Sequence, residues 1–307
     1  MSQPNQRWVR AAVLPLCAIL MFAVLCTSPI RAWAAPILRK GSSGDAVALL
    51  QKSLSDLGYS PGPVDGDFGP RTDSAVRNFQ EAMGLRPDGI CGPLTWAALE
   101  RASSDPSRGR AIRRTGALAG KTITIDPGHG GNEPGALSIW GDKEKDFTLA
   151  IGLKVRKYLE EQGAEVVMTR YGDYPPGSDW GWTVDELVAR ASLANTNESD
   201  LFVSIHINAY PEDKTVSGVM GFYRKGSVES SRLARSLANE VGKYTGLRMI
   251  DVQVGPYYVL NHTYMPAALV EVGFMTNYGD VNSLRTDSFI DNAARGIVSG
   301  IIDYLTD

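Results

Sequence analysis

Between residues 37 and 101 the apolar positions recur at helical spacing, and one short pattern occurs twice. Ala46-Val47-x-x-Leu50-Gln51 returns 29 positions later as Ala75-Val76-x-x-Phe79-Gln80. Apolar residues three and four positions apart form the buried stripe of an amphipathic helix, and Gly58 and Gly84 are placed to end the two helices. With a third short helix expected at residues 93–99, the pattern predicts a small all-α domain of three helices over residues 37–101.

From Lys121 onward, short apolar runs rich in β-branched residues alternate with amphipathic helical segments. The predicted strands are 122–126, 165–169, 201–205, 219–223 and 267–272, and the predicted helices are 146–161, 184–194 and 230–241. Such alternation is typical of a mostly parallel, twisted sheet with helices on both faces. The sequence therefore predicts an α/β domain over residues 120–307.

The segment between these two regions has no apolar periodicity. Residues 103–114 read Ser-Ser-Asp-Pro-Ser-Arg-Gly-Arg-Ala-Ile-Arg-Arg. Serine, proline and glycine at this density are typical of a loop, and the arginines fit a solvated chain. We therefore predict a linker over residues 102–119.

The first 34 residues differ from the rest of the chain. Arg7 and Arg10 form a basic start, residues 11–26 are an uncharged, largely apolar run, and Ala32-Trp33-Ala34 supplies small residues around a cleavage site. This order is typical of a secretory signal peptide. An uncleaved membrane anchor is the alternative, but a span needs about 20 apolar residues. We predict that residues 1–34 are a cleaved signal peptide, so that the protein is secreted and keeps no membrane attachment.

Removing the predicted signal peptide changes the charge and the cysteine content. Arg7, Arg10 and Arg31 leave with it, so that 28 basic residues face 34 acidic ones and the net charge becomes −6. A nucleic-acid-binding protein would instead present a basic surface, which argues against nucleic acid as a partner. Cys91 becomes the only cysteine, so no internal disulfide can form. Its small and apolar neighbours predict a buried, inert thiol, with an intermolecular disulfide as the alternative.

Chemistry-bearing side chains stand where three of the predicted strands end. The fragments are Asp126-Pro-Gly-His129-Gly-Gly, Ser204-Ile-His206-Ile-Asn208 and Val270-Glu271-Val-Gly-Phe274. In open α/β sheets, sites form at the carboxyl ends of the strands. Two imidazoles and a carboxylate at one edge are the ligands of a catalytic zinc site. The chain has three histidines, and two of them lie in these fragments.

Three carboxylates near this edge have different expected roles. Glu144 lies where a long helix should begin, so taken alone it is a charge favoured by the helix dipole. Glu271 belongs to a buried strand, where an unpartnered carboxylate is costly, so it should be a ligand, a paired charge or a catalytic base. Asp126, close to His129, is expected to orient a ligand rather than to bind metal.

The helical region carries further motifs besides its two repeats. They are Gly44-Asp45-x-Val47, Leu57-Gly58-Tyr59, Val64-Asp65-Gly66-x-Phe68-Gly69, Asp88-Gly89 and Gly92-x-x-Thr95-Trp96. Together these motifs resemble the peptidoglycan-binding domain found beside many cell-wall hydrolases. The resemblance implies that residues 37–101 bind cell-wall glycan or peptide, with a structural spacer as the alternative.

The second domain carries a longer series of motifs. They are Ile125-Asp-Pro-Gly-His129-Gly-Gly, Glu144-Lys-Asp, Thr169-Arg170, Arg190 with Ala194-Asn195, Asp200-Leu-Phe-Val-Ser-Ile-His206-Ile-Asn208-Ala and Met265-Pro266-Ala-x-Leu-Val-Glu271-Val-Gly-Phe-x-Thr-Asn277. In this order they resemble the zinc-dependent N-acetylmuramoyl-L-alanine amidases of the amidase 3 family. Several motifs in family order are far more specific than any one of them.

The resemblance implies a definite chemistry. His129, Glu144 and His206 would hold one Zn²⁺ per chain, which replaces the helix-end interpretation of Glu144, and Glu271 would be the catalytic acid/base. The implied enzyme is an autolysin that uses a zinc-activated water to cut the amide bond between N-acetylmuramic acid and L-alanine of peptidoglycan. It would be associated with the cell wall, and both domains would bind peptidoglycan. Other divalent ions fit the same ligand types.

Two other functions stay open at this point. The protein could bind the wall without catalysis, or it could be a zinc peptidase that cuts within the stem peptide. The position of cleavage separates these readings from the amidase. The oligomeric state is open, with a monomer as the default expectation.

The remaining polar residues near the site are not expected to bind metal or to act in catalysis. His262 borders the predicted cleft and is not expected to be a ligand, while Arg190 and Asn208 are expected to position strand ends and helices. Some family members carry an inserted helix between the second histidine motif and the catalytic glutamate, which blocks the zinc. Here His206 and Glu271 are 65 residues apart. Predicted strand, helix and loop segments use that length, so no built-in plug is expected.

Overall fold

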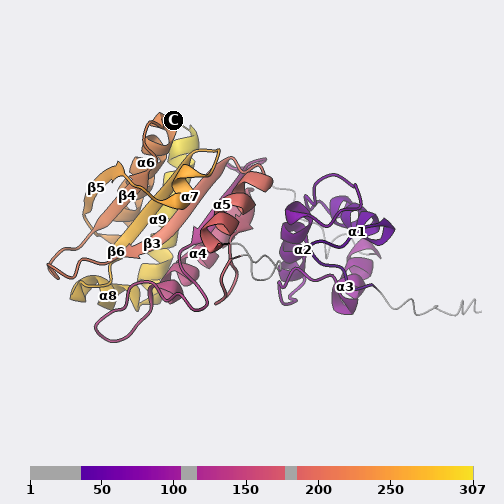
Figure 1. The fold of residues 1–307 in the computed structure, drawn as a ribbon, viewed down its shortest axis with the longest axis horizontal. Coiled ribbons are helices and arrows are strands. Elements are labelled where there is room, and N and C mark those ends of the chain that lie inside the picture. Colours follow the sequence, from indigo (N-terminus) through magenta and orange to yellow (C-terminus); the bar gives the residue numbers. More distant parts are fainter. Residues whose placement is uncertain (1–35, 105–115, 177–184, 307) are drawn as a thin grey trace, which may run out of the picture. The chain divides into compact units, whose positions relative to one another are not determined.

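The computed structural model describes residues 36–104, 116–176 and 185–306. Residues 36–104 are helical, and the chain from residue 116 forms an α/β domain (Figure 1). The predicted signal peptide and residues 105–115 of the predicted linker lie outside the described residues. None of the described helices has the length and apolar character needed to cross a membrane.

Three helices make up the described part of the N-terminal region, as predicted. They are α1 (Asp45–Asp56), α2 (Pro70–Ala82) and α3 (Pro93–Ser104). The apolar residues of both repeats, including Val47, Leu50 and Phe79, are buried in one core. Cys91 lies in the same core, where burial raises the pKa of its thiol to about 12. The prediction of a buried thiol is therefore confirmed.

The glutamine at the end of each repeat explains why the pattern occurs twice. Each buried glutamine donates to an aspartate carboxylate and to a threonine hydroxyl, and its carbonyl oxygen accepts from a glycine N–H. The two sets are Gln51 with Asp65, Thr72 and Gly66, and Gln80 with Asp88, Thr95 and Gly89. Because a buried amide is costly unless both ends are satisfied, each glutamine fixes the loop that follows its helix.

A six-stranded sheet forms the centre of the described α/β domain, in the order β2-β1-β3-β6-β4-β5. Its strands are β1 (Thr122–Pro127), β2 (Glu165–Met168), β3 (Leu201–Asn208), β4 (Val219–Tyr223), β5 (Met249–Val254) and β6 (Ala267–Phe274). β1, β2, β3 and β6 are parallel, β4 pairs antiparallel with β6, and β5 is parallel to β4. The predicted mostly parallel sheet is confirmed.

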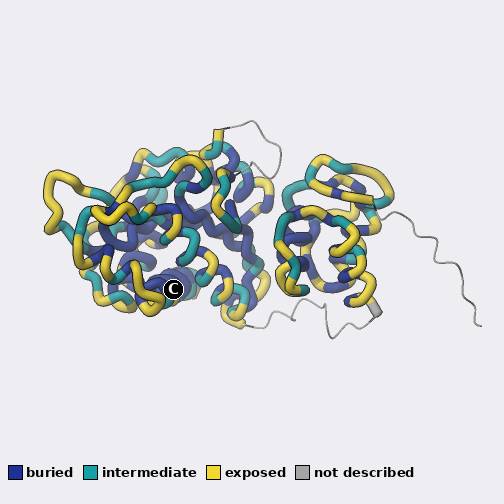
Figure 2. The backbone as a smooth tube through the Cα atoms, turned by 90° about the horizontal axis from the view of Figure 1, so that it is seen from below, coloured by how far each residue is buried: buried dark blue, intermediate teal, exposed yellow. Residues whose placement is uncertain are grey.

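Helices cover both faces of this sheet (Figure 1). α4 (Glu144–Glu161), α6 (Val228–Thr245) and α9 (Asp287–Thr306) cover one face, α5 (Glu186–Thr196) and α7 (Tyr258–Asn261) cover the other, and α8 (Tyr278–Leu284) follows β6. Side chains alternate along each strand, so Ile125 and Val203 face α4 while Phe202 and Leu269 face α7. Figure 2 shows buried residues through the interior of the α/β domain.

Several details differ from the sequence expectations. Strand β5 was not predicted, because this edge strand has one buried residue and lacks an apolar run. Helix α9 was not predicted either, and its glycines lower the helical propensity of the segment. Part of the predicted linker is structured, since α3 continues to Ser104 and Leu118 is buried in the core of the α/β domain.

Candidate metal centre and catalytic site

Strand register brings the predicted site residues to one edge of the sheet. In the β1–β3 pair Asp126 lies beside Ser204, and in the β3–β6 pair His206 lies beside Glu271. Because side chains alternate along a strand, all four point to the face that α5 and α7 cover. Within the first pair, the Ser204 hydroxyl donates to Asp126 Oδ2 at 2.8 Å.

Three side chains present ligand atoms to one point. His129 follows β1, Glu144 is the first residue of α4, and His206 lies in β3. Glu144 Oε1 is 3.0 Å from His129 Nε2 and 3.0 Å from His206 Nδ1. All three ligand atoms lie within 4.8 Å of one another. Ligand atoms around a tetrahedral zinc ion are about 3.4 Å apart, so the donor set fits a single ion.

The backbone around His129 is adapted to this convergence. His129 has a φ of 61°, a left-handed conformation that is uncommon outside glycine and recurs at functional sites. A Cβ on Gly128 would lie 2.3 Å from the His206 ring, and one on Gly135 would lie 2.6 Å from Glu144 Oε2. Glycine at both positions therefore allows the three ligand side chains to approach.

Two buried arginines hold the loop that carries His129. Arg170 donates to the Gly128 carbonyl oxygen at 2.9 Å, and Arg190 donates to the His129 carbonyl oxygen at 2.8 Å. Arg190 also donates to Asp126 Oδ1 at 2.6 Å. Burial alone would raise the pKa of Asp126, but the Arg190 charge brings it below its ordinary value. Arg190 thus connects the Asp126 carboxylate to the backbone of His129 by hydrogen bonds.

A carboxylate that the sequence did not single out contacts the outer nitrogen of His129. Glu133 Oε2 meets His129 Nδ1, and Glu133 Oε1 accepts from the Gly135 N–H at 3.1 Å. A carboxylate on the second nitrogen of an imidazole fixes its tautomer and its orientation, here with Nε2 facing Glu144. Glu133 lies in a loop without periodicity, so its closeness to His129 in the sequence is the signal that could have identified it.

The two glutamates of the site have opposite electrostatic environments. Burial alone would raise the pKa of Glu144, but its hydrogen bonds with His129 and His206 bring it below the ordinary value, which favours the carboxylate. For Glu271, burial and then the nearby Glu144 charge raise the pKa well above the ordinary value. Glu271 Oε2 is buried with no hydrogen-bond partner among the described residues. Such a perturbed, unpartnered carboxyl group is a candidate acid/base.

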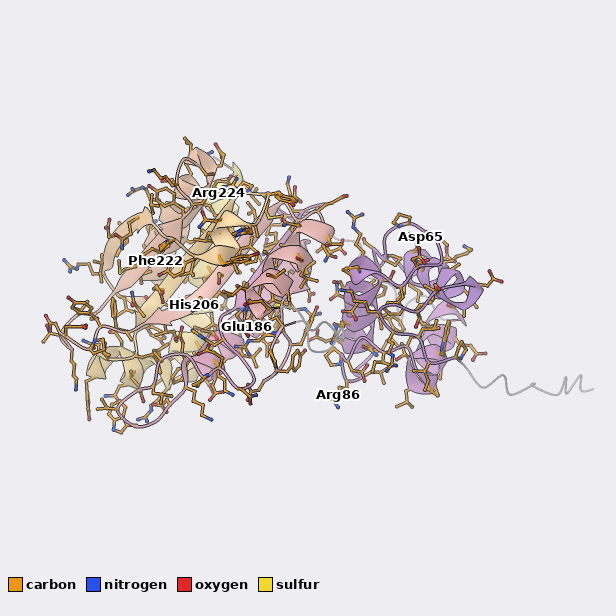
Figure 3. All side chains as sticks on the ribbon, in the orientation of Figure 1. Asp65, Arg86, Glu186, His206, Phe222 and Arg224 are labelled. Atoms are coloured by element: carbon orange, nitrogen blue, oxygen red, sulfur yellow. The ribbon has the colours of Figure 1, made fainter. Side chains whose placement is uncertain are left out.

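A cavity of about 220 Å³ opens beside the two imidazoles. Its walls come from the candidate site, the start of α5 and the region of α7, and they comprise Asp126, His129, Glu133, Glu186, Leu187, Arg190, His206, Tyr257, Tyr258, Val259 and Leu269. Figure 3 labels two of them, His206 on the sheet and Glu186 at the start of α5. Burial, with Glu271 and Glu144 nearby, raises the pKa of Tyr257 to about 12, so its hydroxyl is a neutral donor at this wall.

Two residues considered from the sequence lie outside the ligand group. The His262 ring stacks on Tyr258 with 3.7 Å between ring centres, and His262 Nδ1 is 2.9 Å from the Tyr258 carbonyl oxygen. Asn208 Oδ1 accepts from the Ala209 N–H at the end of β3. Within the described ranges, the group that could hold a metal is His129, Glu144 and His206.

Two family models match the chain. Residues 123–303 match the N-acetylmuramoyl-L-alanine amidase family, and residues 43–99 match a peptidoglycan binding domain. The first match includes all the candidate site residues, and the second covers most of the three-helix region.

Individual proteins are similar over the same regions. The germination-specific N-acetylmuramoyl-L-alanine amidase of Bacillus subtilis is 36% identical over 198 residues, which are 62% of this chain and 82% of the relative. The N-acetylmuramoyl-L-alanine amidase CwlM of Mycobacterium tuberculosis is 32% identical over 275 residues, 84% of this chain and 65% of the relative. The crystal structure of an N-acetylmuramoyl-L-alanine amidase from Clostridium difficile 630 has a TM-score of 0.56 at 33% identity, covering 61% of this chain and 97% of that one.

Proposed function

Because the chain belongs to the N-acetylmuramoyl-L-alanine amidase family, we propose that it is a secreted cell-wall hydrolase acting on peptidoglycan. The bond cleaved is the amide between N-acetylmuramic acid and the L-alanine of the stem peptide. The observation that carries the proposal is the convergence of His129, Glu144 and His206, with Glu271 in register beside His206. Metal ligands with an unpartnered buried carboxyl group on the neighbouring strand suit the hydrolysis of an unactivated amide.

We assign one zinc ion per chain to His129, Glu144 and His206. Two backbone hydrogen bonds orient the Glu144 carboxylate. Its Oε2 accepts from the Ala136 N–H and its Oε1 accepts from the Ile207 N–H, both at 2.9 Å. A zinc ion bound there supplies Lewis acidity, which polarises a carbonyl group and lowers the pKa of a water molecule. The ligand types also accept other divalent ions.

Glu271 is assigned as the group that moves the proton. Its free Oε2 accepts a proton from the attacking water as the water oxygen adds to the lactyl carbonyl carbon. The protonated carboxyl group then donates to the alanine nitrogen as the carbon–nitrogen bond breaks. The raised pKa makes the Glu271 carboxylate a stronger proton acceptor than an ordinary glutamate.

The three-helix region is assigned to substrate attachment. The part that the structure describes contains no cluster of candidate metal ligands, and its match to a peptidoglycan binding domain supports a binding role. Together with the signal-peptide pattern of residues 1–34, this supports a secreted enzyme associated with the cell wall.

We further infer that the site needs no activator. Between β3 and β6 the described chain forms β4, α6, β5 and the four-residue α7, joined by loops. Helix α6 packs against α9 on the face opposite the candidate site. If purified protein hydrolysed peptidoglycan only after another protein was added, this inference would be wrong.

The decisive experiment is digestion of purified peptidoglycan by the chain from residue 35, with identification of the new terminal groups. New amino-terminal alanine without new reducing sugar ends is expected. New termini elsewhere in the peptide would favour a peptidase. No new termini, with zinc supplied and wall binding retained, would indicate a binding protein.

Variants of the site divide the roles. Glu271→Gln is expected to lower turnover by at least about 10²-fold and to keep zinc and wall binding. Glu144→Ala and His206→Ala are expected to lose the metal. Metal analysis of each purified variant checks the assignment, and full zinc occupancy in either alanine variant would refute it.

A further inference from the structure

Large apolar side chains are exposed on the segments that follow β1 and β6, the strands that lead to His129 and carry Glu271. Leu137, Ile139 and Trp140 lie on the loop between β1 and α4, and Tyr278 lies at the start of α8. Their exposed fractions are 57%, 59%, 38% and 61%. The rings of Trp140 and Tyr278 are 4.6 Å apart between their centres. We call these four residues the aromatic platform. Exposed apolar patches on soluble proteins often mark binding sites.

Hydrogen bonds order the loop that carries Trp140. The Ser138 N–H donates to the Asp142 carbonyl oxygen at 3.0 Å, and the Ser138 hydroxyl donates to Asp142 Oδ2 at 2.6 Å while accepting from the Trp140 N–H. Arg285, just after α8, donates to both Asp142 carboxylate oxygens and lies 4.2 Å from the centre of the Trp140 ring. Side chains that are already ordered lose little conformational freedom when a ligand binds.

The platform is connected directly to the proposed catalytic residues. Leu137 follows Ala136, whose N–H binds Glu144 Oε2 at 2.9 Å, and Trp140 precedes Glu144 by four residues. Tyr278 comes seven residues after Glu271. Figure 1 shows α8 and the loop that leads into α4 at the same end of the sheet. A polymer with one amide bond at the candidate site would therefore reach the platform with its neighbouring groups.

The lack of net charge on the platform favours one of the two parts of peptidoglycan, the stem peptide or the glycan strand. Arg285 and Asp142, which contact the platform, neutralise each other. Leu137, Ile139, Trp140 and Tyr278 are uncharged. Stem peptides carry free carboxylates, whereas the amide-linked sugars of the strand are neutral and have apolar ring faces that pack on aromatic side chains. The glycan strand is the better match.

We propose that the aromatic platform binds the glycan strand of peptidoglycan, as a sugar subsite beside the muramic acid whose amide bond is cleaved. This inference rests on the proposed function, because it places the scissile bond between the metal ligands and Glu271. It adds a reason for the enzyme to prefer polymeric substrate over a single muramoyl peptide.

The test compares two substrates that differ in neighbouring sugars. Trp140→Ala and Tyr278→Ala are assayed on soluble uncrosslinked peptidoglycan strands and on a single-sugar muramoyl dipeptide. Loss of one stacking partner is expected to lower kcat/KM on strands about tenfold and to leave the dipeptide within twofold of the wild type. Tyr278→Phe, which keeps the ring, is expected to retain strand activity.

The control is Tyr304→Ala at the C-terminal end of α9. Tyr304 also lies under an arginine, with Arg232 5.2 Å from its ring centre, and Figure 1 shows that this end of α9 lies away from α8. It is expected to leave both rates unchanged. Equal losses on both substrates for the platform variants, or no loss on strands, would overturn the proposal.

Failure of the proposed function gives a different result. In that case the wild type releases no alanine amino terminus from either substrate. The platform is then judged by the binding of strands to Glu271→Gln protein with and without Trp140→Ala. Equal affinity of the two proteins for strands would overturn the proposal, and a tenfold weaker affinity of the protein with Trp140→Ala would support it.

Discussion

The orientation of one imidazole decides whether three ligand atoms can meet. His129 has its Nε2 toward Glu144 and its Nδ1 toward Glu133, and its backbone has a positive φ. Gly128 leaves room for the His206 ring that approaches it. A conformation of this kind persists because its surroundings over-determine it, and here buried arginines bind the carbonyl groups of the loop.

Replacing Glu133 tests the support of that imidazole. Glu133→Gln is expected to weaken metal affinity by about 10- to 100-fold, because the carboxylate that orients His129 is lost. Zinc titration against a competing chelator measures the change, and Glu133→Asp is expected to recover part of it. Glu186→Gln is the matched control, because Glu186 lines the same cavity and lies near Arg190 rather than an imidazole. Equal zinc affinity for Glu133→Gln and the wild type would contradict this role.

The raised pKa of Glu271 has a consequence for stability as well as for catalysis. An unfolded glutamate loses its proton near pH 4.3, whereas Glu271 in the folded chain keeps its proton to a higher pH. The folded state therefore binds more protons between these two values, and stability falls as the pH rises through this window.

Glu271→Gln removes this loss because glutamine does not ionise. In metal-free protein the variant is expected to be more stable than the wild type at pH 7, by about 1–3 kcal/mol. The difference should vanish below about pH 4, where both side chains are neutral. Chemical denaturation with chelator present, repeated across this pH range, measures it. A variant less stable than the wild type at pH 7 would argue against a Glu271 carboxylate that is destabilised by burial.

At the scale of elements, the contact between α6 and α9 depends on glycine. A Cβ on Gly296 would lie 2.7 Å from Val241 Cα, and one on Gly300 would lie 2.8 Å from Leu237 Cα. Glycine normally weakens a helix interior. Here it lets the two helices approach closely on the face of the sheet opposite the candidate site.

Gly296→Ala is expected to destabilise the α/β domain although alanine is the better helix former. The backbone clash should cost about 1–3 kcal/mol, against a gain of about 1 kcal/mol in helix propensity. Asn292→Ala, at an exposed position of the same helix, is the control and should be neutral or stabilising. Thermal denaturation of both variants gives the comparison, and a more stable Gly296→Ala protein would refute the close contact.

At the same scale, the sequence predicted strands better than the segments between them. β1, β3 and β6 were marked by apolar runs, and all three were found, with β3 and β6 extending a few residues further. β5 and α9 were missed, because an exposed edge strand and a glycine-containing helix lack the local pattern. Local periodicity records burial on one side of an element, and it weakens where burial is partial.

At the scale of the whole molecule, a binding region and a catalytic region lie on one chain. Two regions that hold the same polymer raise the effective concentration of one at the site of the other. The repeated glutamine contacts make the helical region a defined structure, so its contribution can be separated from that of the α/β domain.

Deleting residues 36–104 is expected to lower the rate on insoluble peptidoglycan by about tenfold or more. The rate on a soluble muramoyl dipeptide should not change, because that substrate needs no tether. Release of alanine amino termini from both substrates measures the effect, after a thermal melt has established that the shortened chain folds. Unchanged activity on insoluble peptidoglycan would assign the helical region to a spacer role.

By itself, the sequence determined the repeated helices, the mostly parallel sheet and the family to which the chain belongs. Those features follow from the local spacing of apolar residues and from the order of the motifs along the chain. Tertiary structure decided that His206 pairs with Glu271, that Glu133 supports His129 and that Trp140 meets Tyr278. Each of these contacts depends on strand register and loop conformation. Both are set by packing among distant segments, and no local pattern records that packing.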